Sequence, residues 1–218
     1  MAAVAETAAA ILAGGNSGRM GRDKITAPFG EGCFLTQEAE ALAEFPQRYL
    51  AGGWGEGWVE GWELPGWQLV ADQYPGCGPL AGVQAALAAC TGRWLVACSC
   101  DLPVLRARLP RLLVAEAQPP YQAVVPVDPA GQAHPLCAIY AKELEPVARA
   151  LLEAGQYRMA GLLDRAKVRY LPVSGGLGIM LTNVNSPLDY RILLANSAQL
   201  PLDQLFWPKT EDGGESDV

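Results

Sequence analysis

Short apolar runs alternate along the chain with longer segments of helical periodicity. Near-continuous apolar runs of four to six residues are typical of strands buried on both faces of a sheet. They occur at residues 8–12, 68–71, 94–99, 123–127 and 136–140. The segments between them predict helices, at residues 35–45, 82–90 and 144–154. This alternation predicts an α/β fold with a mostly parallel central sheet covered by helices.

A further helix is predicted to start at residues 186–189. Ser186 is a suitable N-cap, Pro187 suits the first helical position, and Asp189 is placed to complete a capping box.

Two segments do not fit the alternating pattern. Residues 51–67 contain four of the six tryptophans among glycines, which disfavour a stable helix. We expect a surface loop with partly buried rings there, the alternative being a platform on which a base stacks. The last residues are polar and acidic, so we expect one domain at residues 1–205 and a disordered acidic tail at 206–218.

Composition narrows the function classes. A chain of 218 residues that is half apolar can bury one substantial core. It has neither an apolar run of the roughly 20 residues that span a bilayer nor a signal-peptide pattern, so we expect a cytoplasmic protein with no membrane partner. The net charge of -7 argues against a nucleic-acid partner, which would need a basic face.

Cysteine usage suggests neither disulfides nor zinc. The six cysteines form no C-x-x-C pair, and the only histidine is His134. Cys98 and Cys100 lie in or beside an apolar run, where free cysteine behaves as a small hydrophobe. We therefore expect reduced core thiols.

The segment with the strongest chemical signal follows the first predicted strand. Residues 12–24 read LAGGNSGRMGRDK and combine four glycines with Arg19 and Lys24. Glycines let main-chain N–H groups approach an anion, and cationic side chains such as Arg19 and Lys24 can meet phosphate oxygens. The segment fits neither a Walker P-loop nor the G-x-G-x-x-G pattern. It predicts a phosphate-binding loop for a nucleotide.

Two aspartates follow predicted strands. Asp101 comes directly after the apolar run WLVACSC, and Asp72 follows residues 68–71 and precedes QYPGCGPLAG. Ligands of open parallel sheets bind beyond the carboxyl ends of the strands, so a carboxylate at Asp101 is well placed to hold Mg²⁺ against phosphates. The alternative for Asp101 is a helix cap. The glycine-rich turn after Asp72 suits a base or a ribose.

These motifs together resemble a known family. The segments LAGGNSGRMGRDK, DQYPGCGPLAG, CSCDLP, His134-Pro135-Leu136 and NVNSP occur in an order similar to that of the molybdenum cofactor guanylyltransferases, which are MobA-like nucleotidyltransferases. The resemblance runs from about residue 8 to about residue 194. It implies a single-domain, Rossmann-like three-layer sandwich of the nucleotide-diphospho-sugar transferase type. It also implies transfer of GMP from GTP to molybdenum-bearing molybdopterin, which gives the guanine dinucleotide cofactor and pyrophosphate.

The resemblance also implies roles for individual residues. The nucleotide-binding set is Leu12, Ala13, Gly14, Gly15, Lys24, Asp72 and Asp101. The catalytic set is Arg19, Lys24 and Asp101, with Asp101 as the Mg²⁺ ligand. The pterin-side set is His134, Asn183 and Asn185. Further partners implied are the proteins that deliver molybdopterin and those that mature the receiving molybdoenzyme.

The chain departs from the family pattern at one place. The stretch after the first helix reads Tyr49-Leu50-Ala51-Gly52-Gly53-Trp54, without the usual asparagine that contacts the nucleotide. The main chain at Gly52 or Gly53 replaces that contact, or the contact is lost.

Three functions remain open at this point. Besides guanylyl transfer, they are nucleotidyl transfer from CTP or to a sugar or polyol phosphate, and nucleotide binding without catalysis. Gly14-Gly15 favours guanine, because related cytidylyltransferases tend to carry Ala-Gly there. In the favoured reaction an ionised phosphate attacks the α-phosphorus of GTP, so no general base is needed, and His134 is structural or a hydrogen-bonding group of the pterin pocket.

Overall fold

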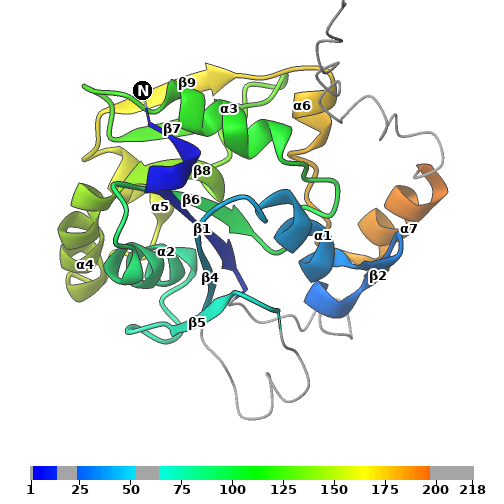
Figure 1. Cartoon of the computed structure of the whole chain (residues 1–218), viewed down its shortest axis with the longest axis horizontal. Coiled ribbons are helices and arrows are strands. Elements are labelled where there is room, and N and C mark those ends of the chain that lie inside the picture. The colour runs from blue at the N-terminus through cyan, green and yellow to red at the C-terminus, as the bar shows by residue number, and fades with distance from the viewer. Residues whose placement is uncertain (1, 14–23, 53–63, 197–218) are drawn as a thin grey trace, which may run out of the picture.

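The predicted apolar runs form the central sheet. The computed structural model describes residues 2–13, 24–52 and 64–196. The strands of its main sheet are β1 (Thr7–Leu12), β4 (Gln47–Gly52), β5 (Gln68–Ala71), β6 (Trp94–Ser99), β7 (Ala123–Val127), β8 (Cys137–Ala141) and β9 (Val168–Pro172). Their order is β5-β4-β1-β6-β8-β7-β9 (Figure 1). Neighbouring strands are parallel except that β8 is antiparallel to both β6 and β7, so the prediction of a mostly parallel sheet is confirmed.

Helices and a small hairpin surround this sheet. The helices are α1 (Phe34–Ala41), α2 (Pro79–Ala89), α3 (Arg108–Glu116), α4 (Glu145–Glu153), α5 (Met159–Leu163), α6 (Gly176–Ile179) and α7 (Pro187–Asn196). Short 3-10 turns occur at η1 (Val4–Glu6), η2 (Lys24–Thr26) and η3 (Lys142–Leu144), and β2 (Pro28–Phe29) pairs with β3 (Gly32–Cys33).

Two apolar cores lie on opposite faces of the sheet, which makes three layers. Alternate residues of a strand point to opposite faces. Thus Ala9 and Ile11 of β1 join the core beneath α1 and α3, whereas Ala8 and Ala10 join the core beneath α2, α4 and α5. The alanines let the helices pack closely on β1, whose six residues are all buried. A third, smaller cluster joins α1, the β2–β3 hairpin and α7 through Phe29, Phe34, Leu193 and Tyr190.

Most element predictions are confirmed, with shifted ends. β5, β6 and β7 have the predicted bounds, and β1 and β8 differ by one residue. α2 begins at Pro79 rather than residue 82, because proline has no N–H and the N–H groups of a first turn have no acceptor within the helix. The helix predicted at residues 35–45 is α1, which ends at Ala41. Phe45 lies beyond the helix but is still buried. The hydrophobic pattern did not predict β2, β3, β4, β9, α3, α5 and α6.

The predicted capping box at α7 is confirmed. The Asp189 carboxylate accepts hydrogen bonds from the N–H groups of Ser186, at 2.8 Å, and of Asn185, at 3.0 Å. The Ser186 hydroxyl in turn accepts the Asp189 N–H at 3.2 Å. This reciprocal pair fixes where the chain turns into α7.

Several sequence expectations concern residues outside the described ones. The tail at 206–218 lies there, and so does most of the tryptophan-rich segment, which is described only at 51–52 and 64–67.

All six cysteines are free; Cys77 and Cys100 are half-buried and the other four are buried. In the described part of the chain, none of the helices has both the length and the apolarity to cross a bilayer.

Candidate active site

The site is built at the edge of the sheet where the parallel strands end. Within the main sheet the next strand of the chain after β1 is β4, which lies on one side of β1, whereas β6 lies on its other side. Successive strands are thus added first on one side of β1 and then on the other. In open α/β sheets such a reversal of strand order leaves a crevice beyond the carboxyl ends of the strands. Because β8 runs in the opposite direction to β6, its amino end lies at this same edge. The crevice therefore receives the ends of β1, β5 and β6 together with the segment before β8.

The end of β1 is held by both of its neighbours. The Ala13 N–H donates to the Ala51 carbonyl of β4 at 2.8 Å, and the Cys100 N–H donates to the Leu12 carbonyl at 3.2 Å. Leu12 and Ala13 are buried. The predicted site residues Gly14, Gly15 and Arg19 lie outside the described residues. Lys24 begins η2, and only its main chain is described. The structure thus describes the residues on either side of the glycine-rich segment, Ala13 before it and Lys24 after it.

Asp101 sits just beyond β6 in a turn with several hydrogen bonds. Its carboxylate accepts the Ser99 hydroxyl at 2.5 Å, and its main-chain carbonyl accepts the Val184 N–H at 3.0 Å. The second bond brings the segment containing Asn183 and Asn185 to the end of β6. Asp101 is half-buried, so this residue is not enclosed in the core.

A buried glutamate supports this turn, a role that was not predicted from the sequence. Glu38 of α1 is fully buried, and its Oε1 accepts the N–H of Leu102 at 2.9 Å. A buried carboxylate is costly unless it has polar partners, so its presence behind the Asp101 turn is informative. The available signal was its position: Glu38 falls on the apolar helical face that contains Leu35 and Ala39.

Asp72 continues β5 and presents one buried oxygen. Its N–H donates to the Gly52 carbonyl at 3.1 Å, which extends the ladder between β4 and β5. Within the described residues its Oδ1 is buried and has no hydrogen-bond partner. Burial raises the pKa of the Asp72 carboxyl to about 6. A buried acceptor without a partner is suited to receive donors from a bound molecule.

The first turns of α2 lie against the strand ends near Asp72. A Cβ at Gly82 would lie 3.4 Å from Leu12 Cδ2 and 3.6 Å from Asp72 Oδ1, which are ordinary van der Waals distances. Gly82 therefore lies directly beside the ends of β1 and β5.

A cavity of about 170 Å³ lies beside the Asp101 turn. Its lining residues are Ser99, Leu102, Gln132, Ala133, His134, Pro135, Leu136, Cys137 and Asn183. The Ser99 N–H donates to the Leu136 carbonyl at 2.7 Å, so the cavity and the Asp101 turn share a wall. The structure thus brings together the predicted residues His134, Asn183 and Asp101.

An aspartate from the same loop holds His134. His134 Nε2 hydrogen-bonds Asp128 Oδ2 at 3.0 Å, and the imidazole side chain is 10% exposed. This bond, with the N–H groups of Gln132 and Ala130, lowers the pKa of Asp128. His134 is therefore fixed in orientation at the cavity wall. Asp128 is a further site residue that the sequence analysis missed.

The structure does not bring Asn185 to this cavity, and it gives the Gly52 carbonyl a partner within the sheet. Asn185 does not line this cavity; its N–H is bonded to Asp189 at the start of α7. The Gly52 carbonyl, one of the groups offered as a replacement for the missing asparagine, is occupied by the Asp72 N–H. Gly53, the other replacement, lies outside the described residues.

Comparisons with known proteins agree with this architecture. Residues 9–169 match the family model described as the MobA-like NTP transferase domain. A relative from Deinococcus radiodurans, named a probable molybdenum cofactor guanylyltransferase, is 34% identical over 181 residues, which cover 83% of this chain and 90% of the relative. One of the same name from Carboxydothermus hydrogenoformans is 33% identical over 85% of this chain and 93% of its own length.

A solved structure shares the fold. The molybdopterin-guanine dinucleotide biosynthesis protein A of Archaeoglobus fulgidus superposes with a TM-score of 0.75 at 22% identity. The superposition covers 88% of this chain and 99% of that protein. The three-layer arrangement expected from the resemblance is thereby confirmed.

Proposed function

Because the chain belongs to the family of MobA-like NTP transferase domains, we propose that it is a molybdenum cofactor guanylyltransferase. It transfers GMP from GTP to molybdopterin that carries molybdenum, and the products are the guanine dinucleotide cofactor and pyrophosphate. The observation that carries the proposal is the meeting of Leu12–Ala13, Asp72 and Asp101 at one sheet edge, next to a cavity lined by His134 and Asn183.

The proposed base contact is Asp72. Guanine presents two adjacent donors, N1–H and the N2 amino group, and a carboxylate accepts both. The buried Oδ1 has no partner among the described residues and can accept one of them. Adenine presents an acceptor at N1, so the same carboxylate would repel it. This complementarity supports guanine as the base.

The proposed reaction is an in-line displacement at the α-phosphorus. An oxygen of the terminal phosphate of molybdopterin forms a bond to the α-phosphorus of GTP. The bond from that phosphorus to the bridging oxygen of the β-phosphate breaks, and pyrophosphate leaves with the electron pair. The attacking phosphate is ionised at neutral pH, so the protein must position two anions and offset their charge rather than remove a proton.

Several carboxylates at the crevice make cations necessary for this task. Asp72, Asp101 and Asp128 all lie at the sheet edge that would receive phosphates. We assign the required positive charge to Arg19 and Lys24 of the glycine-rich loop and to Mg²⁺ held by Asp101. Carboxylate and hydroxyl oxygens are the groups that Mg²⁺ prefers, and Asp101 with Ser99 offers both. When bound, the ion offsets the charge that develops on the phosphate oxygens.

The cavity beside Asp101 is the proposed acceptor side. Its main-chain groups and the fixed His134 ring offer donors and acceptors, which a pterin needs along its edges. We place Asn183 on this side together with His134. Asn185 lies two residues further on, toward α7.

A nucleotide panel tests the proposal. The purified protein is incubated with Mg²⁺, molybdopterin carrying molybdenum, and GTP, CTP or ATP, and pyrophosphate release is measured. We expect release with GTP only, and transfer of radiolabelled GMP to the pterin. Release with CTP in preference to GTP would assign cytidylyl transfer instead. GTP binding without transfer of label would show a binding protein that is not an enzyme.

A further inference from the structure

A polar network ties the loop that carries Asp72 to α4, on the same side of the sheet. This loop, residues 72–78, leads from β5 to α2 and enters the helix through Gly78, whose φ of +75° suits glycine. β5 is a four-residue strand at the sheet edge, and Leu69 in it is 52% exposed. Such an edge strand is paired on one side only, so contacts from other elements add to the Asp72–Gly52 main-chain bond in holding the loop.

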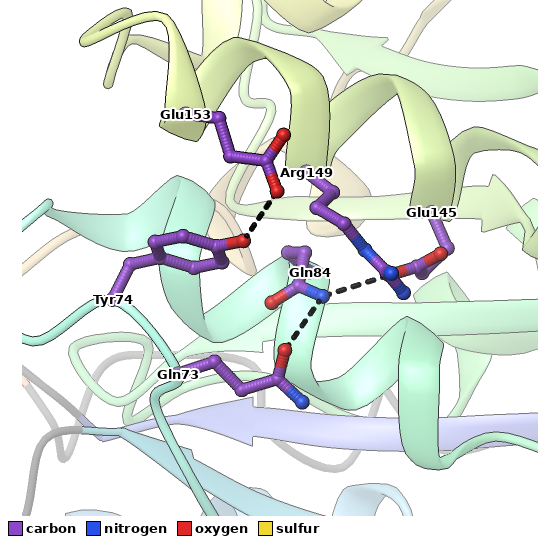
Figure 2. A network of polar contacts seen from close by, with 6 residues as sticks. All are labelled: Gln73, Tyr74, Gln84, Glu145, Arg149 and Glu153. Carbon is purple, nitrogen blue, oxygen red and sulfur yellow. Dashed lines mark hydrogen bonds and ion pairs between the residues drawn. The ribbon is translucent and has the colours of Figure 1, made fainter.

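Two side-chain contacts of the loop reach across to neighbouring elements. Gln84 Nε2 of α2 donates to Gln73 Oε1 at 3.4 Å. The Tyr74 hydroxyl donates to Glu153 Oε1 of α4 at 3.1 Å (Figure 2). Residues 73 and 74 are therefore each anchored from outside the sheet.

Gln84 lies at the centre of this network. Its Nε2 also donates to Glu145 Oε1 of α4 at 2.8 Å, and the same oxygen accepts Arg149 Nη2 at 2.6 Å. Figure 2 shows Gln84 on α2 between Gln73 of the loop and Glu145 on α4. Glu145 thus receives donors from two residues, and the position of Gln84 depends on α4.

The burial of Gln84 argues for a purpose beyond packing. Its side chain is fully buried beside the apolar residues Leu80, Val83 and Leu87 of the same helix. Within the described residues its Oε1 has no hydrogen-bond partner. Burying an amide in this way costs free energy that an apolar side chain of equal size would not cost. The compensating gain is the directional link from Glu145 to Gln73.

We propose that Gln84, held by Glu145, is a positioning residue that fixes the loop carrying Asp72 and so sets selectivity for guanine. Gln73 is bonded in the chain to Asp72, so the Gln84 contact restricts the direction in which the Asp72 carboxylate points. The inference rests on the proposed function, because the base at Asp72 is taken to be that of GTP.

The decisive variant is Gln84→Met, which has similar volume and no donor. We expect the dissociation constant for GTP to rise about 3- to 10-fold, the loss of one hydrogen bond, while the weaker binding of ATP stays unchanged. The KM for GTP should rise by the same factor, and kcat at saturating GTP should not change. Lost packing alone would weaken both nucleotides alike.

Gln122→Met is the matched control. Gln122 also donates to a glutamate, Glu143 Oε1, at 2.8 Å. It immediately precedes the amino end of β7, whereas the crevice lies beyond the carboxyl ends of the parallel strands. This variant should keep the wild-type ratio of GTP to ATP affinity. If Gln84→Met is too unstable to purify, Tyr74→Phe breaks the Glu153 contact at a less buried position and should lower the same ratio.

Amide hydrogen exchange tests the inference without any nucleotide. Residues 73–77 should exchange faster in Gln84→Met than in wild type or Gln122→Met. Unchanged exchange there, or an unchanged ratio of GTP to ATP affinity in a folded Gln84→Met protein, would overturn the inference. Failure of the proposed function looks different: the wild-type protein itself would show no preference for GTP and no transfer of GMP.

Discussion

At the scale of single residues, the two strand-end aspartates differ in their surroundings. The carboxylate of Asp101 accepts a hydroxyl, whereas Asp72 has a buried oxygen without a partner among the described residues. The first arrangement suits a cation shared with phosphates, and the second suits a base with donors.

Asp101→Asn should abolish transfer and leave the fold intact. The amide has no charge to hold Mg²⁺, and Asp101 is only half-buried, so its replacement costs little stability. We expect kcat to fall by about 100-fold or more, which corresponds to about 2.7 kcal/mol of barrier. Pyrophosphate release measures the loss of transfer, and thermal melting shows whether the fold is intact. Wild-type turnover of this variant at saturating Mg²⁺ would rule out Asp101 as the metal ligand.

GTP binding should weaken as the pH falls through about 6. The Asp72 carboxyl has its pKa raised to about 6 by burial, and only its ionised form accepts both guanine donors. The dissociation constant for GTP, measured by calorimetry, should be constant above pH 7 and rise below pH 6. In Asp72→Asn it should be about 10- to 100-fold higher at pH 7 and should lose this pH dependence.

The same carboxyl should make the free protein less stable at neutral pH. A folded-state pKa above the unfolded value of 3.8 means that the folded state holds its proton more tightly. The stabilisation from that proton is complete below pH 3.8 and is lost as the pH rises through about 6. Asp72→Asn should therefore melt at a higher temperature than wild type at pH 7, and the difference should shrink toward pH 4. No change in the difference with pH would contradict the raised pKa.

At the scale of elements, the turn after β6 depends on α1. Glu38 accepts the Leu102 N–H from a fully buried position, so this hydrogen bond links α1 to the Asp101 turn. In Glu38→Leu the N–H would lose its acceptor, at a cost of about 1–3 kcal/mol in the free energy of unfolding. Glu38→Gln keeps an acceptor and should be closer to wild type. Urea unfolding and the Mg²⁺ dependence of turnover measure both effects, and equal behaviour of the two variants would exclude this supporting role.

The first turn of α7 offers a test of stability alone. Ser186→Ala removes the hydroxyl that accepts the Asp189 N–H and should cost about 1 kcal/mol of helix or protein stability. Neither Ser186 nor Asp189 lines the cavity beside Asp101, so GTP affinity should stay unchanged. Thermal melting and nucleotide binding of the same preparation check both statements.

Some elements could be predicted from the sequence and others could not, for physical reasons. β6 is buried on both faces, and its uninterrupted apolar run gives its bounds. β9 is an edge strand whose residues are exposed or half-buried, so no apolar run marks it. In α3 the buried Leu109 and Leu113 have helical spacing, but Pro110 between them disguises the pattern. Proline is tolerated there because it lies in the first turn.

At the scale of the whole molecule, strand order decides what the site contains. The sequence could predict that Asp72 and Asp101 end strands, and parallel strands end at one edge of a sheet. It could not predict that β8 runs against its neighbours, since local pattern holds no information on direction. Glu38 and Gln84 were missed for a related reason: their roles depend on partners that are distant in the sequence and on burial that only the fold creates. Asp128 is six residues from His134, but no local pattern pairs the two side chains.

The reversed direction of β8 has an evolutionary consequence. The proposed nucleotide side comes from the ends of β1, β5 and β6, whereas the proposed acceptor side is formed largely by residues 132–137, between β7 and β8. Connections between strands tolerate exchange better than the strands they join. A lineage can therefore replace this one hairpin and acquire a different phosphorylated acceptor while it inherits the nucleotide half unchanged.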